Sequence, residues 1–142
     1  MLEQVHQHIT SELQQGARTD TVFVITAIIF DLLVLGINSA VAAAAADPYR
    51  DQTSIASDLV LGILVVLVIL VNGIAIAGLL TGRETRAKLL GGLLAMYRDN
   101  SVEKYYDATL LTNYNRRYML FTGVILCLAL TAIVVPVIVR TL

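Results

Sequence analysis

Three long apolar blocks are the feature of this sequence that most constrains its fold. They run from Thr21 to Ala46, from Ile55 to Thr81 and from Tyr118 to Val139. Each is longer than the roughly 20 residues that a helix needs to cross about 30 Å of hydrocarbon. The rest of the chain is too short to bury all three in water. The blocks therefore predict three membrane spans.

The spans are expected to be α-helices. A bilayer offers no partners to free backbone groups, so only helices and closed barrels cross it. Barrel strands alternate apolar and polar residues, whereas 61–71 is almost unbroken large aliphatic sequence. The chain is 57% hydrophobic and 15% charged, against about 25% charged in ordinary soluble domains. We expect one all-α membrane domain over residues 1–142.

The basic residues predict the orientation. The segment 82–117 is rich in Lys and Arg, whereas the acidic loop 47–54 carries only Arg50. Since cytoplasmic loops carry the excess of Lys and Arg, we expect 82–117 and the N-terminus inside and the C-terminus outside. No organelle signal is visible, so the plasma membrane is the expected location. The basic residues concerned are Arg83, Arg86, Lys88, Arg98, Lys104, Arg116 and Arg117.

The first 18 residues predict a separate amphipathic helix. Its apolar stripe is Leu2, Val5, Ile9 and Leu13, and Gly16 is expected to end it. Such a helix lies on the inner membrane surface or packs on the bundle. His6 and His8 would point about 200° apart on it, so they cannot share a metal ion.

The segment 82–117 predicts a cytoplasmic helical hairpin that continues the second and third spans. Apolar residues keep helical spacing on both sides of Asp99, and no proline intervenes. Asn100, followed by Glu103 three residues later, indicates a helix start. We expect two upright arms of nearly equal length; the alternative is a bend near Gly82 that lays them on the membrane. The first span would then be short beside two long helices.

Polar side chains interrupt the first two blocks at Asp31, Asn38 and Asn72. A central aspartate costs about 2.5 to 3.5 kcal/mol on the insertion scale. Asp31 and Asn38 share one face of their helix. The depth of Asn72 in its span matches that of Asp31 within about one helical turn. Two interpretations stay open: a polar strip lining an ion or proton path, or hydrogen bonding that fixes helix register.

Enzyme chemistry finds no support in the sequence. Phosphate-binding glycine motifs and zinc-ligand spacings are absent, Cys127 is the only cysteine, and no span carries a catalytic pair. We expect no catalytic residues, no metal and no cofactor. Nucleic-acid binding is not expected either, because carboxylates offset the basic residues of 82–117. Membrane lipids are the expected surroundings.

Two functional hypotheses follow. In the first, the protein is a homo-oligomeric ion channel whose pore is lined by the first span, with Asp31 facing it; three thin helices alone rarely enclose a water path, so symmetry would be needed. In the second, it is a non-enzymatic scaffold or adaptor. Its cytoplasmic hairpin would then bind a protein partner through Tyr97, Tyr105 and Tyr106.

Overall fold

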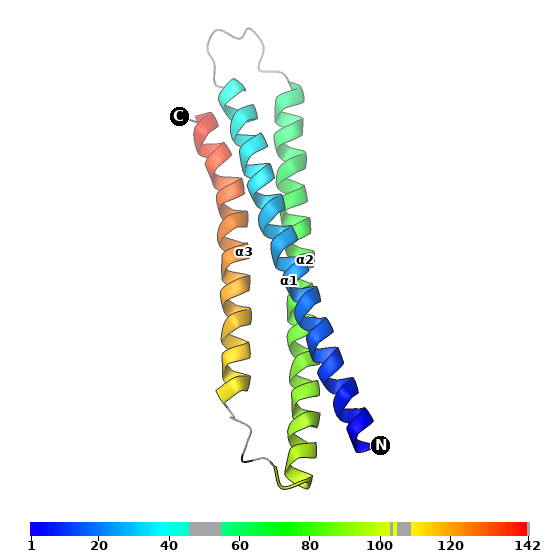
Figure 1. Ribbon diagram of the computed structural model, residues 1–142. Helices are drawn as coiled ribbons and strands as arrows, with labels where there is room; N and C mark the ends of the chain where they lie inside the picture. Colours follow the sequence, from blue (N-terminus) through cyan, green and yellow to red (C-terminus); the bar gives the residue numbers. More distant parts are fainter. Residues whose placement is uncertain (46–54, 103, 105–108, 142) are drawn as a thin grey trace.

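The computed structural model describes residues 1–45, 55–102, 104 and 109–141, and these form a bundle of three α-helices. The helices are α1 (Leu2–Ala45), α2 (Ile55–Asp99) and α3 (Thr109–Thr141). The described residues contain no strand. Figure 1 shows the chain passing along the bundle three times, with the N-terminus at the end where α2 finishes and the C-terminus at the opposite end.

All three helices are long and apolar enough to cross a membrane. The chain therefore has the features of a multi-pass membrane protein. At 1.5 Å per residue, the 44 residues of α1 reach about 66 Å, more than twice a hydrocarbon core of about 30 Å. The prediction that the first helix is short beside two long helices is therefore wrong. α1 is nearly as long as α2, and α3, with 33 residues, is the shortest.

The N-terminal segment is not a separate helix, because α1 passes through Gly16 without ending. Its partly buried positions include His6, Ile9 and Gly16, whereas Leu2 and Val5 stay exposed. The inner face is thus rotated away from the first two residues of the predicted stripe. A glycine costs about 1 kcal/mol in a helix relative to alanine, which is too little to end a helix that continues along a neighbour.

The end of α2 corrects the prediction for Asn100. This residue follows the last turn of α2, and its side-chain amide donates to the carbonyl of Met96 at 2.8 Å. Beyond it, Ser101 has a positive φ of 58°. The amide of Ser101 donates to Arg98 O (3.1 Å) and that of Val102 to Tyr97 O (3.0 Å). This is the Schellman pattern of a helix C-terminus, so Asn100 marks an end rather than a start.

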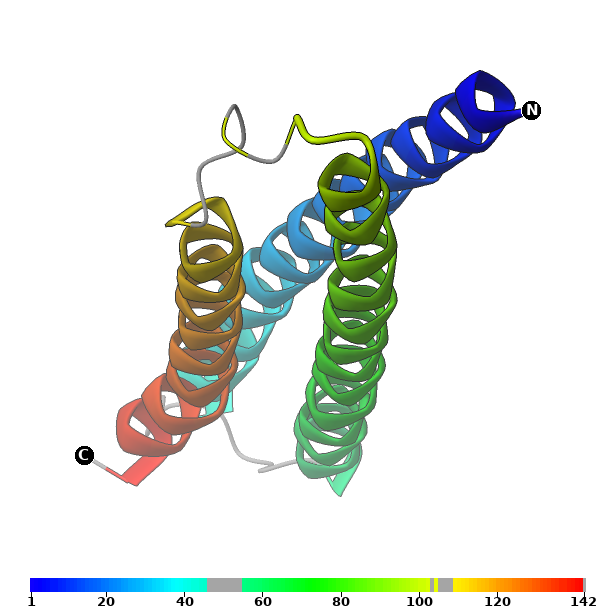
Figure 2. The ribbon, with the colours of Figure 1, turned by 90° about the horizontal axis from the view of Figure 1, so that it is seen from below.

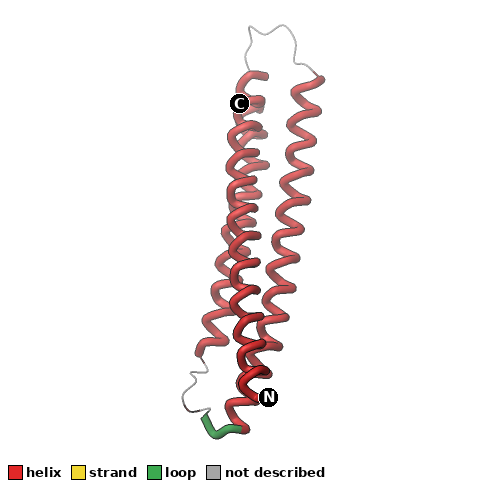
Figure 3. Tube along the Cα trace, turned by 45° about the vertical axis from the view of Figure 1, so that its right-hand side comes forward, coloured by secondary structure: helices red, strands yellow, loops and turns green. Residues whose placement is uncertain are grey.

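The two arms of the predicted hairpin are described only in part. α2 passes Gly82 as one uninterrupted helix and continues to Asp99 (Figure 3). α3 begins only at Thr109, and the described residues Ser101, Val102 and Lys104 are not α-helical. The predicted helix start at Ser101 is therefore wrong, whereas the equal length of the two arms stays a prediction, because 103 and 105–108 lie outside the described residues.

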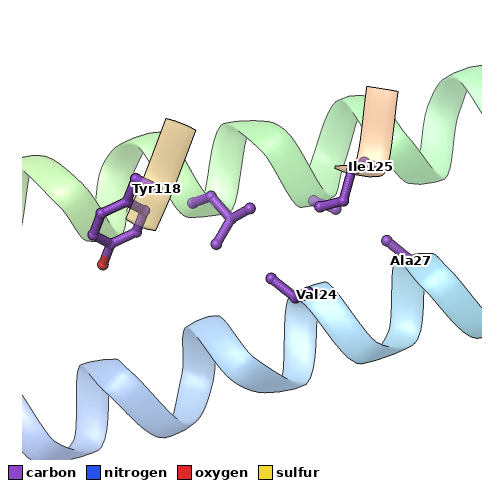
Figure 4. Packing of buried hydrophobic residues seen from close by; sticks show 6 residues of the cluster. Val24, Ala27, Tyr118 and Ile125 are labelled. Atoms are coloured by element: carbon purple, nitrogen blue, oxygen red, sulfur yellow. The ribbon is translucent and has the colours of Figure 1, made fainter. Parts of the chain in front are cut away.

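The core is assembled around α1, which packs against both other helices. Figure 2 shows α1 lying obliquely across α2 and α3. In Figure 4, Val24 and Ala27 of α1 point towards Tyr118 and Ile125 of α3. Small residues such as Ala27 let helix backbones approach closely in a membrane, where apolar burial alone gives little drive. The buried positions of α1 recur every three or four residues and are Asp20, Val24, Ala27, Asp31, Val34, Asn38 and Ala42.

Candidate functional site

Asp31 of α1 and Asn72 of α2 meet inside the bundle. The side-chain amide of Asn72 donates to Asp31 Oδ1 at 2.7 Å and also to the carbonyl of Val68 at 2.8 Å. Asp31 is 1% exposed and Asn72 is 4% exposed. The structure thus contains the interhelical contact that the matched depths of these two residues anticipated.

Several buried polar atoms in this part of the bundle have no hydrogen-bond partner. They are Asp31 Oδ2, Asn72 Oδ1, and both Oδ1 and Nδ2 of Asn38. Buried polar groups in native structures are almost always paired, and leaving one unpaired costs about 1 to 3 kcal/mol. This concentration of unsatisfied groups distinguishes the middle of the bundle from its remaining described core.

Asn38 shares the buried stripe of α1 with Asp31 but lies about 10 Å further along the helix axis, since seven residues separate them. It is fully buried, and no hydrogen bond links it to Asp31 or Asn72. The structure therefore brings together two of the three predicted polar residues and leaves Asn38 at a separate level.

The predicted pore requires Asp31 to face a symmetry axis between copies. In the single chain, its own helices enclose Asp31. Near this depth, the exposed large side chains of α1 are Ile29, Leu32, Leu33 and Ile37. The outer surface of α1 is aliphatic there, which does not favour a pore lined by Asp31; oligomerisation itself stays a prediction.

A second polar cluster joins all three helices, and it is not among the sites predicted from the sequence. Asp20 of α1 accepts at Oδ2 from Arg86 of α2, 3.2 Å away, and from the hydroxyl of Tyr118 of α3. The guanidinium carbon of Arg86 also lies 5.3 Å from the ring centre of Tyr114 and 5.5 Å from that of Tyr118. Asp20 and Tyr118 are both buried.

Gly82 makes room for this cluster. A Cβ atom at this position would lie 2.6 Å from Asp20 Oδ1, a separation that real side chains do not adopt. α1 and α2 therefore approach closely here because residue 82 has no side chain. The only sequence signal was the position of Asp20 next to the first apolar block, opposite a segment rich in arginine.

The structure describes one of the three tyrosines that were predicted to bind a partner. Tyr97 is half-buried; its hydroxyl lies 3.0 Å from His6 Nε2, and the two rings are 5.9 Å apart. Tyr97 thus ties the last turns of α2 to the start of α1. Tyr105 and Tyr106 lie outside the described residues.

The opposite end of the bundle carries an ion pair between Arg140 of α3 and Asp58 in the first turn of α2. Within the described ranges, no group of three or more His, Cys, Asp or Glu side chains could hold a metal ion. Comparisons with models of protein families, with curated proteins and with solved structures gave no match.

Proposed function

We propose that this chain is a non-enzymatic membrane protein that holds a proton at Asp31 and passes it along the interior of its own three-helix bundle. The observation that carries the proposal is the carboxyl group of Asp31, which is 1% exposed in the middle of a span and has one oxygen without a partner. Ionisable residues inside membrane spans usually serve ion or proton pathways.

The burial of Asp31 and the unpaired atoms around it favour a neutral acid over a carboxylate. One amide hydrogen bond does not compensate a full charge in an apolar medium, since such bonds average about 0.6 kcal/mol in membranes. A proton on Oδ2 would turn that oxygen into a donor. Asn72, which already donates to Oδ1, has its own Oδ1 without a partner. One proton would therefore let acid and amide pair reciprocally and would satisfy two unpaired atoms.

Asn38 supplies the next polar group towards the C-terminal end of α1. Its amide can both donate and accept, and both of its polar atoms lack partners. Towards the other end, the next polar groups are the buried carboxylate of Asp20 and the hydroxyl of Tyr118 that donates to it. In this proposal, transient water molecules connect these levels, and a pore between copies is not required.

The proposed orientation follows from charge. The N-terminus and the C-terminal end of α2 lie at one end of the bundle (Figure 1), and the segment 82–117 carries most of the arginines. The positive-inside rule places this end in the cytoplasm. Asp20 then lies on the cytoplasmic side of Asp31, and the C-terminus lies outside a plasma membrane.

The adaptor alternative has less support from the described residues. The ring and hydroxyl of Tyr97 are in contact with His6, so this side chain does not present its whole surface to a partner.

Proton flux in liposomes tests the proposal. With an imposed potassium gradient and valinomycin, wild-type protein is expected to acidify or alkalinise the lumen faster than empty liposomes. Asp31→Asn should abolish this flux, because the amide cannot release a proton. Asp58→Asn is the matched control, since Asp58 lies at the outer end and pairs with Arg140. Flux that Asp31→Asn leaves unchanged, or no flux from wild type, would contradict the proposal.

A further inference from the structure

A small hollow beside the Asp20 cluster combines positive charge with an apolar lining. Its volume is about 150 Å³, and all three helices contribute to its wall. Since ~10–15 Å³ of such space is enough for one water molecule, the hollow has room for a phosphate group. The lining residues are Leu13, Ala17, Asp20, Thr21, Arg86, Tyr114, Arg117, Tyr118 and Phe121.

The charge of this lining favours an anion. The lining contains two guanidinium groups, those of Arg86 and Arg117, and one carboxylate, that of Asp20. Arg86 is paired with that carboxylate. Arg117 has no ion pair with any described residue, and its guanidinium carbon lies 5.8 Å from the ring centre of Phe121. One positive charge in the hollow is therefore left without a counterion.

A larger hollow on the other side of the Asp20–Arg86 pair provides the contrast. It lies between α1 and α2, has a volume of about 440 Å³ and includes Glu12 and Asp20 against Arg86 alone. Its formal charge is negative, so an anion has no reason to enter it. Of the two hollows that border the Asp20–Arg86 pair, only the one that contains Arg117 favours an anion.

The position of the smaller hollow indicates a lipid rather than a soluble anion. Thr21 and Tyr118 are the first residues of two apolar blocks, so the hollow lies where hydrocarbon meets headgroups. Tyrosines are enriched at this depth, and arginine binds phosphate oxygens through paired donors. The apolar side chains of Leu13 and Phe121 suit the glycerol backbone and the first methylenes of an acyl chain.

We infer that this hollow binds the phosphate of an anionic phospholipid, with Arg117 as the main cationic contact and Tyr114 as a hydroxyl donor. Basic recesses between membrane helices on the cytoplasmic side are known to receive such headgroups. The inference is independent of proton transfer at Asp31, because it concerns different residues at a different depth.

Native mass spectrometry of the full chain in a non-ionic detergent tests the inference. Wild-type protein is expected to bind one phosphatidylglycerol molecule saturably and phosphatidylcholine much more weakly. Arg117→Gln should weaken phosphatidylglycerol binding at least about tenfold, the size expected for the loss of a charged hydrogen bond. Arg116→Gln is the matched control, because this neighbouring arginine is exposed like Arg117 but does not line the hollow.

Four results would overturn the inference: unchanged binding in Arg117→Gln, an equal loss in Arg116→Gln, equal binding of phosphatidylcholine, or displacement of the lipid by millimolar inorganic phosphate. The last would assign the hollow to a soluble anion. Circular dichroism checks that each variant folds. If Arg117→Gln does not fold, Tyr114→Phe replaces it, and the inference then requires weaker phosphatidylglycerol binding in that variant.

Discussion

Buried polar side chains are the residues on which this account depends, and the sequence revealed only some of them. Asp31, Asn38 and Asn72 are visible because each interrupts an apolar block. Asp20 is equally important for packing, yet it stands just before Thr21 and close to Arg18, where it resembles a residue at a membrane boundary. Its burial depends on Arg86, Tyr118 and Gly82, which are remote in sequence. No local pattern predicts such a meeting.

Gly82→Ala is the substitution that tests the close approach at Asp20. The new methyl group would collide with Asp20 Oδ1 and displace the carboxylate from Arg86 and Tyr118. We expect the free energy of unfolding to fall by about 1 to 3 kcal/mol, the usual effect of overpacking. Unfolding in detergent, followed by circular dichroism, measures this change.

Gly91→Ala is the matched control for Gly82→Ala. Both glycines lie within α2, but a Cβ atom at residue 91 meets nothing within 4 Å. Alanine there should raise stability by up to about 1 kcal/mol through helix propensity. Equal effects of the two substitutions would show that Gly82 has no special packing role.

At the scale of the helices, the sequence predicted the apolar spans well and the helix ends poorly. A span is set by about 20 consecutive apolar residues, and all three are within helices. A helix end depends on particular hydrogen bonds and on what packs alongside. Gly16 lies on the inner face of α1, so the helix continues, whereas the turn after Asn100 closes on the carbonyls of Tyr97 and Arg98.

Ser101→Gly tests the assigned end of α2. Ser101 has a φ of 58°, a conformation that costs an L-residue with a side chain roughly 1 to 2 kcal/mol and glycine almost nothing. We expect amide hydrogen exchange in the last turn of α2 to slow by about fivefold, equivalent to ~1 kcal/mol.

Ser11→Gly provides the comparison, because this exposed residue lies inside α1. Glycine there should speed local exchange, since it is a poorer helix former than serine. Faster exchange in the last turn of α2 in Ser101→Gly would rule out the turn described above.

At the scale of the whole molecule, polar contacts between described residues tie different helices together at successive levels. They include His6 with Tyr97, the Asp20 cluster, Arg83 with Asn115, Asp31 with Asn72, and Asp58 with Arg140. The number of spans could be predicted from length and hydropathy. Which way Asp31 faces could not, because its direction depends on how α2 and α3 pack around α1. Because Asp31 faces the interior of the bundle, we propose a proton site inside one chain and not in a pore between copies.

The central claim is that Asp31 carries a proton inside the bundle at neutral pH, and infrared spectroscopy of the reconstituted protein tests it most directly. Wild-type protein is expected to show the carbonyl stretching band of a protonated carboxylic acid. Asp58→Asn should retain that band and Asp31→Asn should lose it. A wild-type spectrum without the band, or a band that survives in Asp31→Asn, would contradict the account.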